Sequence, residues 1–176
     1  MPDNVDFSKR NLLRGKPLGD SALRPPWAIA EGGFAKTCTA CDDCIKACEE
    51  QIIVRGSGGY PEVDFNRGAC TFCGECVDAC DTAALSRDNQ APWQLQLSIS
   101  DRCLARRQVV CQTCGDICDE RAIRFRPALG KVAQPAVNDD LCTGCGACIA
   151  ACPEQALTLQ PVDRVDISLD RIAVHE

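Results

Sequence analysis

Three stretches of the chain show the alternation of apolar and polar residues that is typical of a half-buried β-strand. Two of them, residues 93–99 and 165–169, alternate regularly. The third, residues 60–65, follows the glycine-rich turn at 56–59 and is weaker, because Pro61 cannot donate to a sheet ladder and is tolerated at an edge. The pattern predicts short strands that pack as a sheet.

A longer pattern occurs four times. Four groups of cysteines are each followed by three mainly polar residues and then two apolar ones. The fourth cysteines of successive groups lie 32, 38 and 34 residues apart (48 to 80, 80 to 118, 118 to 152). Repetition at this period indicates one supersecondary unit used four times. We expect each unit to contain a cysteine-bearing loop, a short helical turn and a strand.

Composition makes cysteine the central question. Sixteen of the 176 residues are cysteine, only 5% are aromatic, and the single histidine is the penultimate residue. Apolar burial alone is therefore not expected to hold the fold together. The net charge of −6 argues against nucleic acid as the main partner, and no apolar run is long enough for a transmembrane segment.

The cysteine spacing distinguishes between disulfides, zinc and iron–sulfur clusters. The first, second and fourth groups along the chain read C-x2-C-x2-C-x3-C. The third group has the same later gaps, but its first gap is seven residues long. Disulfide frameworks need export, yet residues 1–33 contain no apolar signal-peptide core. Structural zinc usually takes two separated cysteine pairs, whereas here three thiols lie within seven residues. These alternatives, and a thiol–disulfide role for the C-x-x-C pairs, fit the spacing less well than a cluster.

The spacing resembles that of bacterial two-cluster ferredoxins, in which the fourth cysteine of each motif serves the other motif's cluster. The resemblance implies an α+β fold of two tandem bacterial-ferredoxin-like two-cluster modules, with short strands and helical turns built around [4Fe-4S] clusters. We expect a basic N-terminal segment at 1–33, a first module at 34–90 and a second at 91–176, with a linker at 88–92. Cluster binding should also supply folding free energy.

The same resemblance implies four ligand sets, and all sixteen cysteines are expected to bind iron. The sets are Cys38, Cys41 and Cys44 with Cys80; Cys70, Cys73 and Cys76 with Cys48; Cys103, Cys111 and Cys114 with Cys152; and Cys142, Cys145 and Cys148 with Cys118. Four clusters are predicted, or three if Cys103 is not a ligand and the third site is not filled.

Two departures from the ferredoxin pattern affect these sites. The motif has proline after its fourth cysteine, and only Pro153 keeps it, while Glu49, Asp81 and Asp119 stand elsewhere. Negative charge beside a cluster disfavours adding an electron, so lower potentials or looser clusters are expected there. The stretched gap before Cys111 either presents basic residues to a partner or is a tolerated surface insertion.

The N-terminal segment carries a separate charge signal. Residues 8–24 have a net charge of +4, and residues 8–15 resemble a twin-arginine export motif without the apolar stretch that should follow. Lys9, Arg10 and Arg14 are candidates for docking an acidic partner or a membrane surface. The alternative is a short helix, ended at Gly15, that packs on the body of the protein.

The whole pattern resembles the NapF-type ferredoxins of periplasmic nitrate reductase systems. The resemblance rests on four ferredoxin motifs with the third one stretched, and on the basic residues 8–15. It implies a cytoplasmic accessory protein that binds the molybdenum-containing catalytic subunit of nitrate reductase before that subunit is exported. It further implies that this protein helps the iron–sulfur cluster of that subunit to be installed or reduced.

Three functional hypotheses remain at this stage. The first is the accessory factor for reductase maturation. The second is a polyferredoxin subunit that relays electrons to a reductase, with membrane-associated electron donors among its partners. The third is a zinc-stabilised scaffold. Enzymatic activity is not expected, because four-cysteine ligation leaves iron no open position and the sequence has no nucleotide-binding loop or nucleophile–base pair.

Overall fold

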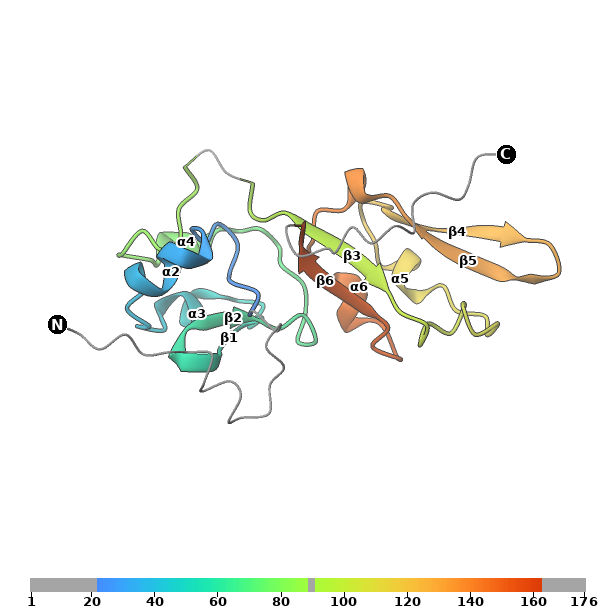
Figure 1. Ribbon diagram of the computed structural model, residues 1–176, viewed down its shortest axis with the longest axis horizontal. Coiled ribbons are helices and arrows are strands. Elements are labelled where there is room, and N and C mark those ends of the chain that lie inside the picture. Colours follow the sequence, from blue (N-terminus) through green and yellow to red (C-terminus); the bar gives the residue numbers. More distant parts are fainter. Residues whose placement is uncertain (1–21, 89–90, 163–176) are drawn as a thin grey trace.

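Two lobes placed end to end make up the part of the chain that the computed structural model describes, residues 22–88 and 91–162 (Figure 1). Helices α2, α3 and α4 with strands β1 and β2 form one lobe. Strands β3 to β6 with helices α5 and α6 form the other. The predicted basic helix, the predicted strand at 165–169 and the centre of the predicted linker lie outside the described residues.

The elements are short, and all strand pairs among the described residues are antiparallel, which gives the α+β class that the sequence predicts. The helices are α2 (Glu31–Thr37), α3 (Asp43–Ala47), α4 (Glu75–Asp78), α5 (Thr113–Asp116) and α6 (Ala147–Ala150), with 3-10 turns η1 (Ser57–Gly59) and η2 (Asp139–Leu141). The strands are β1 (Ile53–Arg55), β2 (Pro61–Val63), β3 (Leu95–Ile99), β4 (Ile123–Ala128), β5 (Lys131–Val137) and β6 (Leu157–Pro161).

A short helix stands at the third cysteine of every motif, as the sequence predicts. Helices α3, α4, α5 and α6 contain Cys44, Cys76, Cys114 and Cys148 in turn. After each helix, the backbone N–H of the fourth cysteine donates to the carbonyl three residues earlier. The x3 spacing is therefore one helical turn, which places the third and fourth cysteines at opposite ends of the same short element.

The apolar pair behind each fourth cysteine forms the core. Its eight members are all at least 96% buried: Ile52, Ile53, Ala84, Leu85, Ala122, Ile123, Ala156 and Leu157. In three of the four repeats the second member begins a strand, β1, β4 or β6. The residue before each pair has a left-handed backbone, with φ between 47° and 54°. This bend turns the chain from the helix into the core.

Each lobe contains a β-hairpin and, on either side of it in the sequence, two segments that pair with each other. The hairpins are β1–β2 and β4–β5, and β3 pairs with β6 so that Leu97 faces Leu159. The predicted strand at 93–99 is confirmed from Leu95 onward, and the candidate at 60–65 is the short strand β2 in a two-stranded sheet. The β4–β5 hairpin was not predicted.

Residues before the predicted boundary at residue 33 contact the first lobe. Ala28 forms an antiparallel bridge with Leu85, which corresponds to the β3–β6 pair of the second lobe. Ile29 N–H donates to the Ala84 carbonyl at 3.0 Å, and Ser86 N–H donates to the Trp27 carbonyl at 2.9 Å. The described residues 22–33 thus pack on the first lobe, and the module bounds stay a prediction.

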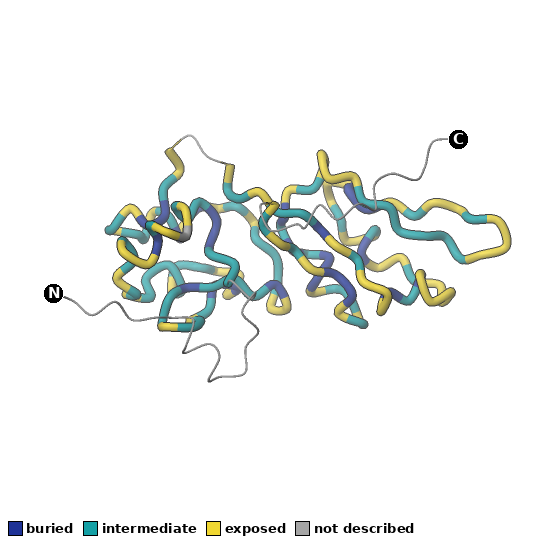
Figure 2. The backbone as a smooth tube through the Cα atoms, in the orientation of Figure 1, coloured by how far each residue is buried: buried dark blue, intermediate teal, exposed yellow. Residues whose placement is uncertain are grey.

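Buried stretches inside both lobes are short, and the end of the β4–β5 hairpin is exposed (Figure 2). Phe34 is among the few large side chains that are fully buried, and its ring lies edge-on to Tyr60 at 6.4 Å. None of the described helices is long and apolar enough to cross a membrane.

Replacing Phe34 by alanine should lower the free energy of unfolding by about 3–5 kcal/mol, because the change leaves a cavity in a packed core. Circular dichroism of the anaerobic protein in denaturant measures this loss. Leu129→Ala is the matched control, since Leu129 is fully exposed at the hairpin end, and it should change stability by less than about 0.5 kcal/mol. Equal effects of the two substitutions would contradict the packing described for Phe34.

Candidate metal centres

Each of the four predicted cysteine quartets lines a cavity among the described residues. We number the sets by the motif that supplies three cysteines. The first set is Cys38, Cys41, Cys44 and Cys80; the second is Cys48, Cys70, Cys73 and Cys76; the third is Cys103, Cys111, Cys114 and Cys152; the fourth is Cys118, Cys142, Cys145 and Cys148. The cavity volumes are about 240, 20, 20 and 390 Å³ in that order. The role of these cysteines as iron ligands stays a prediction.

Left-handed residues shape the loops of the first, second and fourth motifs. The second residue after the first cysteine and the first residue after the second cysteine have positive φ in all three. These residues are Ala40 and Asp42, Phe72 and Gly74, and Gly144 and Gly146. The bends turn backbone amides toward sulfur: Ala40 N–H donates to Cys38 Sγ at 3.5 Å and Phe72 N–H donates to Cys70 Sγ at 3.4 Å. Amides in this position stabilise negative charge on the thiolates.

The third motif closes its cavity differently. Gln112, which follows the second cysteine of this motif, has φ −132° instead of a left-handed backbone. The widened gap folds onto the body of the lobe, where Ala105 is fully buried and its carbonyl accepts a hydrogen bond from Gln134 Nε2 at 2.8 Å. Cys103 is buried as well and lines the third cavity. The insertion therefore completes the set.

The basic residues of that insertion are paired within the chain. Arg106 lies 3.5 Å from an Asp101 oxygen, and Arg107 lies 3.6 Å from an oxygen of Glu154, two residues after Cys152. These contacts favour the interpretation of the gap as a packed surface insertion over that of a docking loop. Exposed ion pairs contribute little stability, so the packing around Ala105 contributes most of the free energy that holds the insertion on the lobe.

Burial disfavours deprotonation of the cysteine thiols in the protein without clusters. The third cysteine of every motif has a raised pKa, to about 11 for Cys44 and Cys114 and to about 12 for Cys76 and Cys148. Burial is the largest cause, and repulsion from the other thiolates of the set adds to it. Four sulfurs in one cavity therefore require a positive centre, which bound iron supplies while protons are released.

Cys80, the fourth ligand of the first set, has the opposite shift. Burial acts to raise its pKa, but hydrogen bonds outweigh burial and lower the pKa below its ordinary value. The donors are the backbone amides of Leu85, Thr82 and Ala84, together with the Thr82 hydroxyl, whose oxygen lies 3.7 Å from Cys80 Sγ. The turn behind this motif thus stabilises a sulfur anion.

The donor set, four thiols lining each cavity, fits a [4Fe-4S] cluster. In a [4Fe-4S] cluster each iron takes one thiolate, so the four sulfurs stand around a cavity. Such a cluster supplies reversible one-electron reduction and a four-point cross-link between both motifs of a module.

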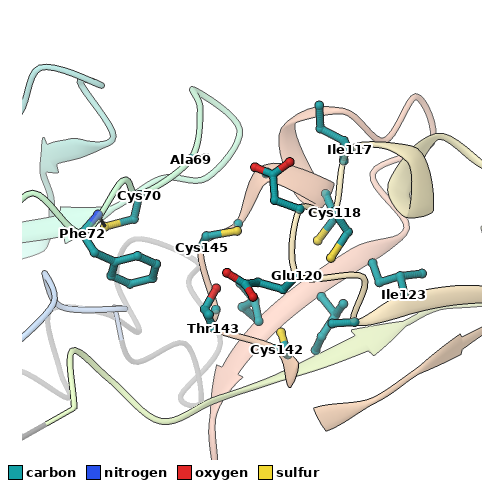
Figure 3. Close-up of a pocket in the computed structure, with 18 of the residues that line it drawn as sticks. Ala69, Cys70, Phe72, Ile117, Cys118, Glu120, Ile123, Cys142, Thr143 and Cys145 are labelled. Carbon is teal, nitrogen blue, oxygen red and sulfur yellow. Dashed lines mark hydrogen bonds between the residues drawn. The ribbon is translucent and has the colours of Figure 1, made fainter. Parts of the chain in front are cut away.

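The residues that follow the fourth cysteines are exposed. Glu49, Asp81 and Asp119 all face solvent, and Asp119 also lines the fourth cavity. Glu120 lines the same cavity (Figure 3). Their carboxylates are hydrated, so their effect on a nearby cluster is weaker than that of a buried charge. Lys9, Arg10 and Arg14, the candidate docking residues, lie outside the described residues.

Comparison with protein families assigns both lobes to one class. Residues 37–85 and residues 109–156 each match a family described as "4Fe-4S dicluster domain". The chain is therefore an iron–sulfur protein with two tandem ferredoxin domains that carry [4Fe-4S] clusters. The second match begins after Cys103, so the place of that residue in the third set rests on the structure.

Full-length relatives narrow the class. "Ferredoxin-type protein NapF" of Escherichia coli strain K12 is 45% identical over 157 residues, which cover 89% of this chain and 96% of the relative. The protein of the same name from Haemophilus influenzae is 47% identical over 165 residues, 88% of this chain and 94% of the relative. "Methylamine utilization ferredoxin-type protein MauM" of Methylobacillus flagellatus is 30% identical over 171 residues, covering 85% and 73%. The chain belongs to the NapF family of ferredoxin-type proteins.

Sequence reasoning missed a contact between the two lobes. Cys70 N–H donates to the Cys145 carbonyl at 2.8 Å, and Cys70 also lines the fourth cavity (Figure 3). The alternation at 93–99 predicts Trp93 only as part of a strand, whereas its side chain lies between these two loops. Trp93 stands two residues before β3, and this place near the start of the second lobe was the one available signal.

Substitution of cysteines in pairs should reveal which of them share a cluster. Cys103→Ala and Cys152→Ala should each lower the iron content by about a quarter, and the double variant should lose no more than either single one, because both act on the third set. Cys103→Ala combined with Cys118→Ala should lose about half, because two sets are broken. Iron analysis after anaerobic purification measures these losses.

Val110→Ala provides the control from the same loop, because this side chain is 78% exposed and lines none of the four cavities. It should keep the full iron content. Equal iron loss in the two double variants would contradict the sharing of ligands between motifs. Full iron in Cys103→Ala would show that this cysteine is not a ligand.

Proposed function

We propose that this protein is a cytoplasmic, non-enzymatic accessory factor that binds the nitrate reductase catalytic subunit before export and supports maturation of its iron–sulfur cluster. Membership of the NapF family supports this proposal. The observation that carries the chemistry is that a set of four cysteines lines each cavity. A cluster with four thiolates has no iron position open for substrate, so it moves electrons or is itself transferred.

Charge supports a basic docking segment. The chain has a net charge of −6, and clusters with four thiolates add further negative charge. Against this field, residues 8–24 carry +4. The basic cluster of Lys9, Arg10 and Arg14 is thus the part of the sequence best suited to an acidic surface on the precursor.

The cytoplasmic location is supported by the cysteine pattern. The spacing is that of cluster ligands and not that of a disulfide framework. Disulfide frameworks belong to oxidising compartments, whereas a reducing compartment keeps cysteines as thiols.

Capture of the reductase precursor tests the docking role. Immobilised wild-type protein should retain the cytoplasmic precursor of the catalytic subunit, and Lys9/Arg10/Arg14→Ala should retain at least tenfold less at low salt, because electrostatic attraction raises association. The bound fraction is quantified by immunoblotting. Failure of the wild type to capture the precursor would contradict the proposed partner.

Arg124/Arg126/Lys131→Ala is the matched control, since it removes the same three positive charges from exposed positions on the β4–β5 hairpin. It should capture the precursor as the wild type does. Equal capture by both triple variants would remove the docking role of residues 9–14.

A second function, that of an electron-transfer polyferredoxin subunit, is favoured by the direct contact between the second and fourth sets. A relay needs tightly held clusters, whereas a maturation factor gives up at least one of them. When a chelator is added anaerobically, we expect the protein to lose part of its iron early while the remaining clusters stay bound. The circular dichroism signal of the fold should fall only when the last clusters are lost. Iron counting and circular dichroism follow both. Full retention of iron together with steady turnover by a reductase would favour the relay.

A further inference from the structure

The two lobes meet at the loops of the second and fourth motifs. Cys70 N–H donates to the Cys145 carbonyl at 2.8 Å, which joins a residue of the second set to a residue of the fourth. The fourth cavity is lined from both sides, with Ala69, Cys70 and Phe72 of the first lobe facing Thr143 and Cys145 of the second (Figure 3).

Trp93 bridges the same two loops. Its Nε1–H donates to the Thr143 carbonyl in the fourth motif at 3.2 Å. Its ring lies edge-on to Phe72 of the second motif, with centroids 5.9 Å apart, and edge-on to Phe65 at 5.7 Å. Edge-to-face pairs at these separations are stabilising beyond the area that they bury. One side chain therefore contacts both lobes.

Two glycines allow the close approach. A Cβ atom at Gly146 would overlap the Phe65 ring, and one at Gly144 would lie 2.8 Å from Trp93 Nε1. Both glycines also have left-handed backbones, with φ of 83° and 76°. The ring of Phe65 thus lies directly on the backbone of the fourth motif. We call Phe65, Phe72, Trp93, Gly144 and Gly146 the joint.

Contacts inside each lobe complete the order of the sets. Helix α3 packs on α4, and α5 packs on α6. These helices carry Cys44 and Cys76 in the first lobe and Cys114 and Cys148 in the second. The first set therefore adjoins the second, and the third adjoins the fourth. With the joint between the lobes, the order in space is first, second, fourth, third.

We propose that electrons cross between the two modules at the joint, and that Trp93 is the positioning residue that holds the second and fourth sets in contact. This inference rests on the electron-transfer function proposed above and on the loading of all four sets. The second and fourth cysteine sets would hold the two clusters, which would supply reversible one-electron reduction. One cluster would be oxidised as the other is reduced, with no bond made or broken and no proton required. The four sets then act as one line with its ends at the first and third sets.

Substitution of Trp93 tests the proposal in the cluster-loaded, full-length protein. Trp93→Ala removes the ring contacts and the hydrogen bond, and Trp93→Phe keeps a ring but removes the hydrogen bond. The first readout is hydrogen exchange, by mass spectrometry, of the peptide that contains the Cys70 amide. We expect exchange to rise about tenfold or more in Trp93→Ala and several-fold in Trp93→Phe, because the joint opens more often.

The second readout is the electron paramagnetic resonance spectrum of the fully reduced protein. Magnetic interaction between neighbouring clusters broadens this spectrum, and the part that arises between the modules should weaken in Trp93→Ala. Tyr60→Phe is the matched control, because it also removes one side-chain hydrogen bond to a carbonyl, from Tyr60 to Ala35 at 3.1 Å, within one lobe. This variant should leave two quantities unchanged: the hydrogen exchange of the Cys70 peptide and the magnetic interaction between the modules.

Iron content separates the possible failures. Wild-type protein with fewer than four clusters would contradict the loading that the proposed function assumes. Full iron with wild-type exchange and an unchanged spectrum in Trp93→Ala would overturn the joint alone. If Trp93→Ala loses iron, Trp93→Phe decides, and its agreement with Tyr60→Phe in both readouts would overturn the positioning role.

Discussion

Everything in this fold depends on bringing sixteen sulfurs together in groups of four, with the third cysteine of each motif in or near the core. Burial and mutual repulsion make a thiolate quartet unfavourable, as the raised pKa values of Cys76 and Cys148 show, unless a positive centre neutralises it. The rest of the chain follows from this requirement. Helices of four or five residues at the third cysteines and strands of three to seven residues are too short to be stable alone. They persist because both motifs of a module meet at the same two cavities.

Much of this arrangement could be predicted, because cysteine spacing is local information. A gap of three residues is one helical turn wherever it occurs, and the apolar pair ending in Ile53 or Leu157 marks the return to the core. The bridge between Ala28 and Leu85 was not predicted, because the two residues lie 57 positions apart and leave no periodic signal. The β4–β5 hairpin did carry a signal, the alternation from Ile123 to Phe125 and the turn at Gly130.

Other features depend on contacts that no local pattern encodes. Gln51 and Arg121 adopt left-handed backbones, which side chains of their type rarely do, and only the position behind a fourth cysteine makes them equivalent. Trp93 fits a strand pattern equally well whether its ring faces solvent or a loop fifty residues later. The joint could therefore not be predicted without the tertiary structure, whereas the grouping of the cysteines into quartets could be predicted from their spacing and its resemblance to that of ferredoxins.

The pairing of the first and last strand of each module has a consequence for biosynthesis. Because every quartet takes a cysteine from each of its two motifs, a ribosome must release the whole of a module before either of its cavities can close. The bridge at Ala28 cannot form until Leu85 is available, and β3 cannot pair until β6 is available. The amino-terminal half can thus acquire metal while the carboxyl-terminal half is still being translated. Assembly has a built-in direction, and the half that finishes first presents its Cys70 loop as the surface on which the later half docks.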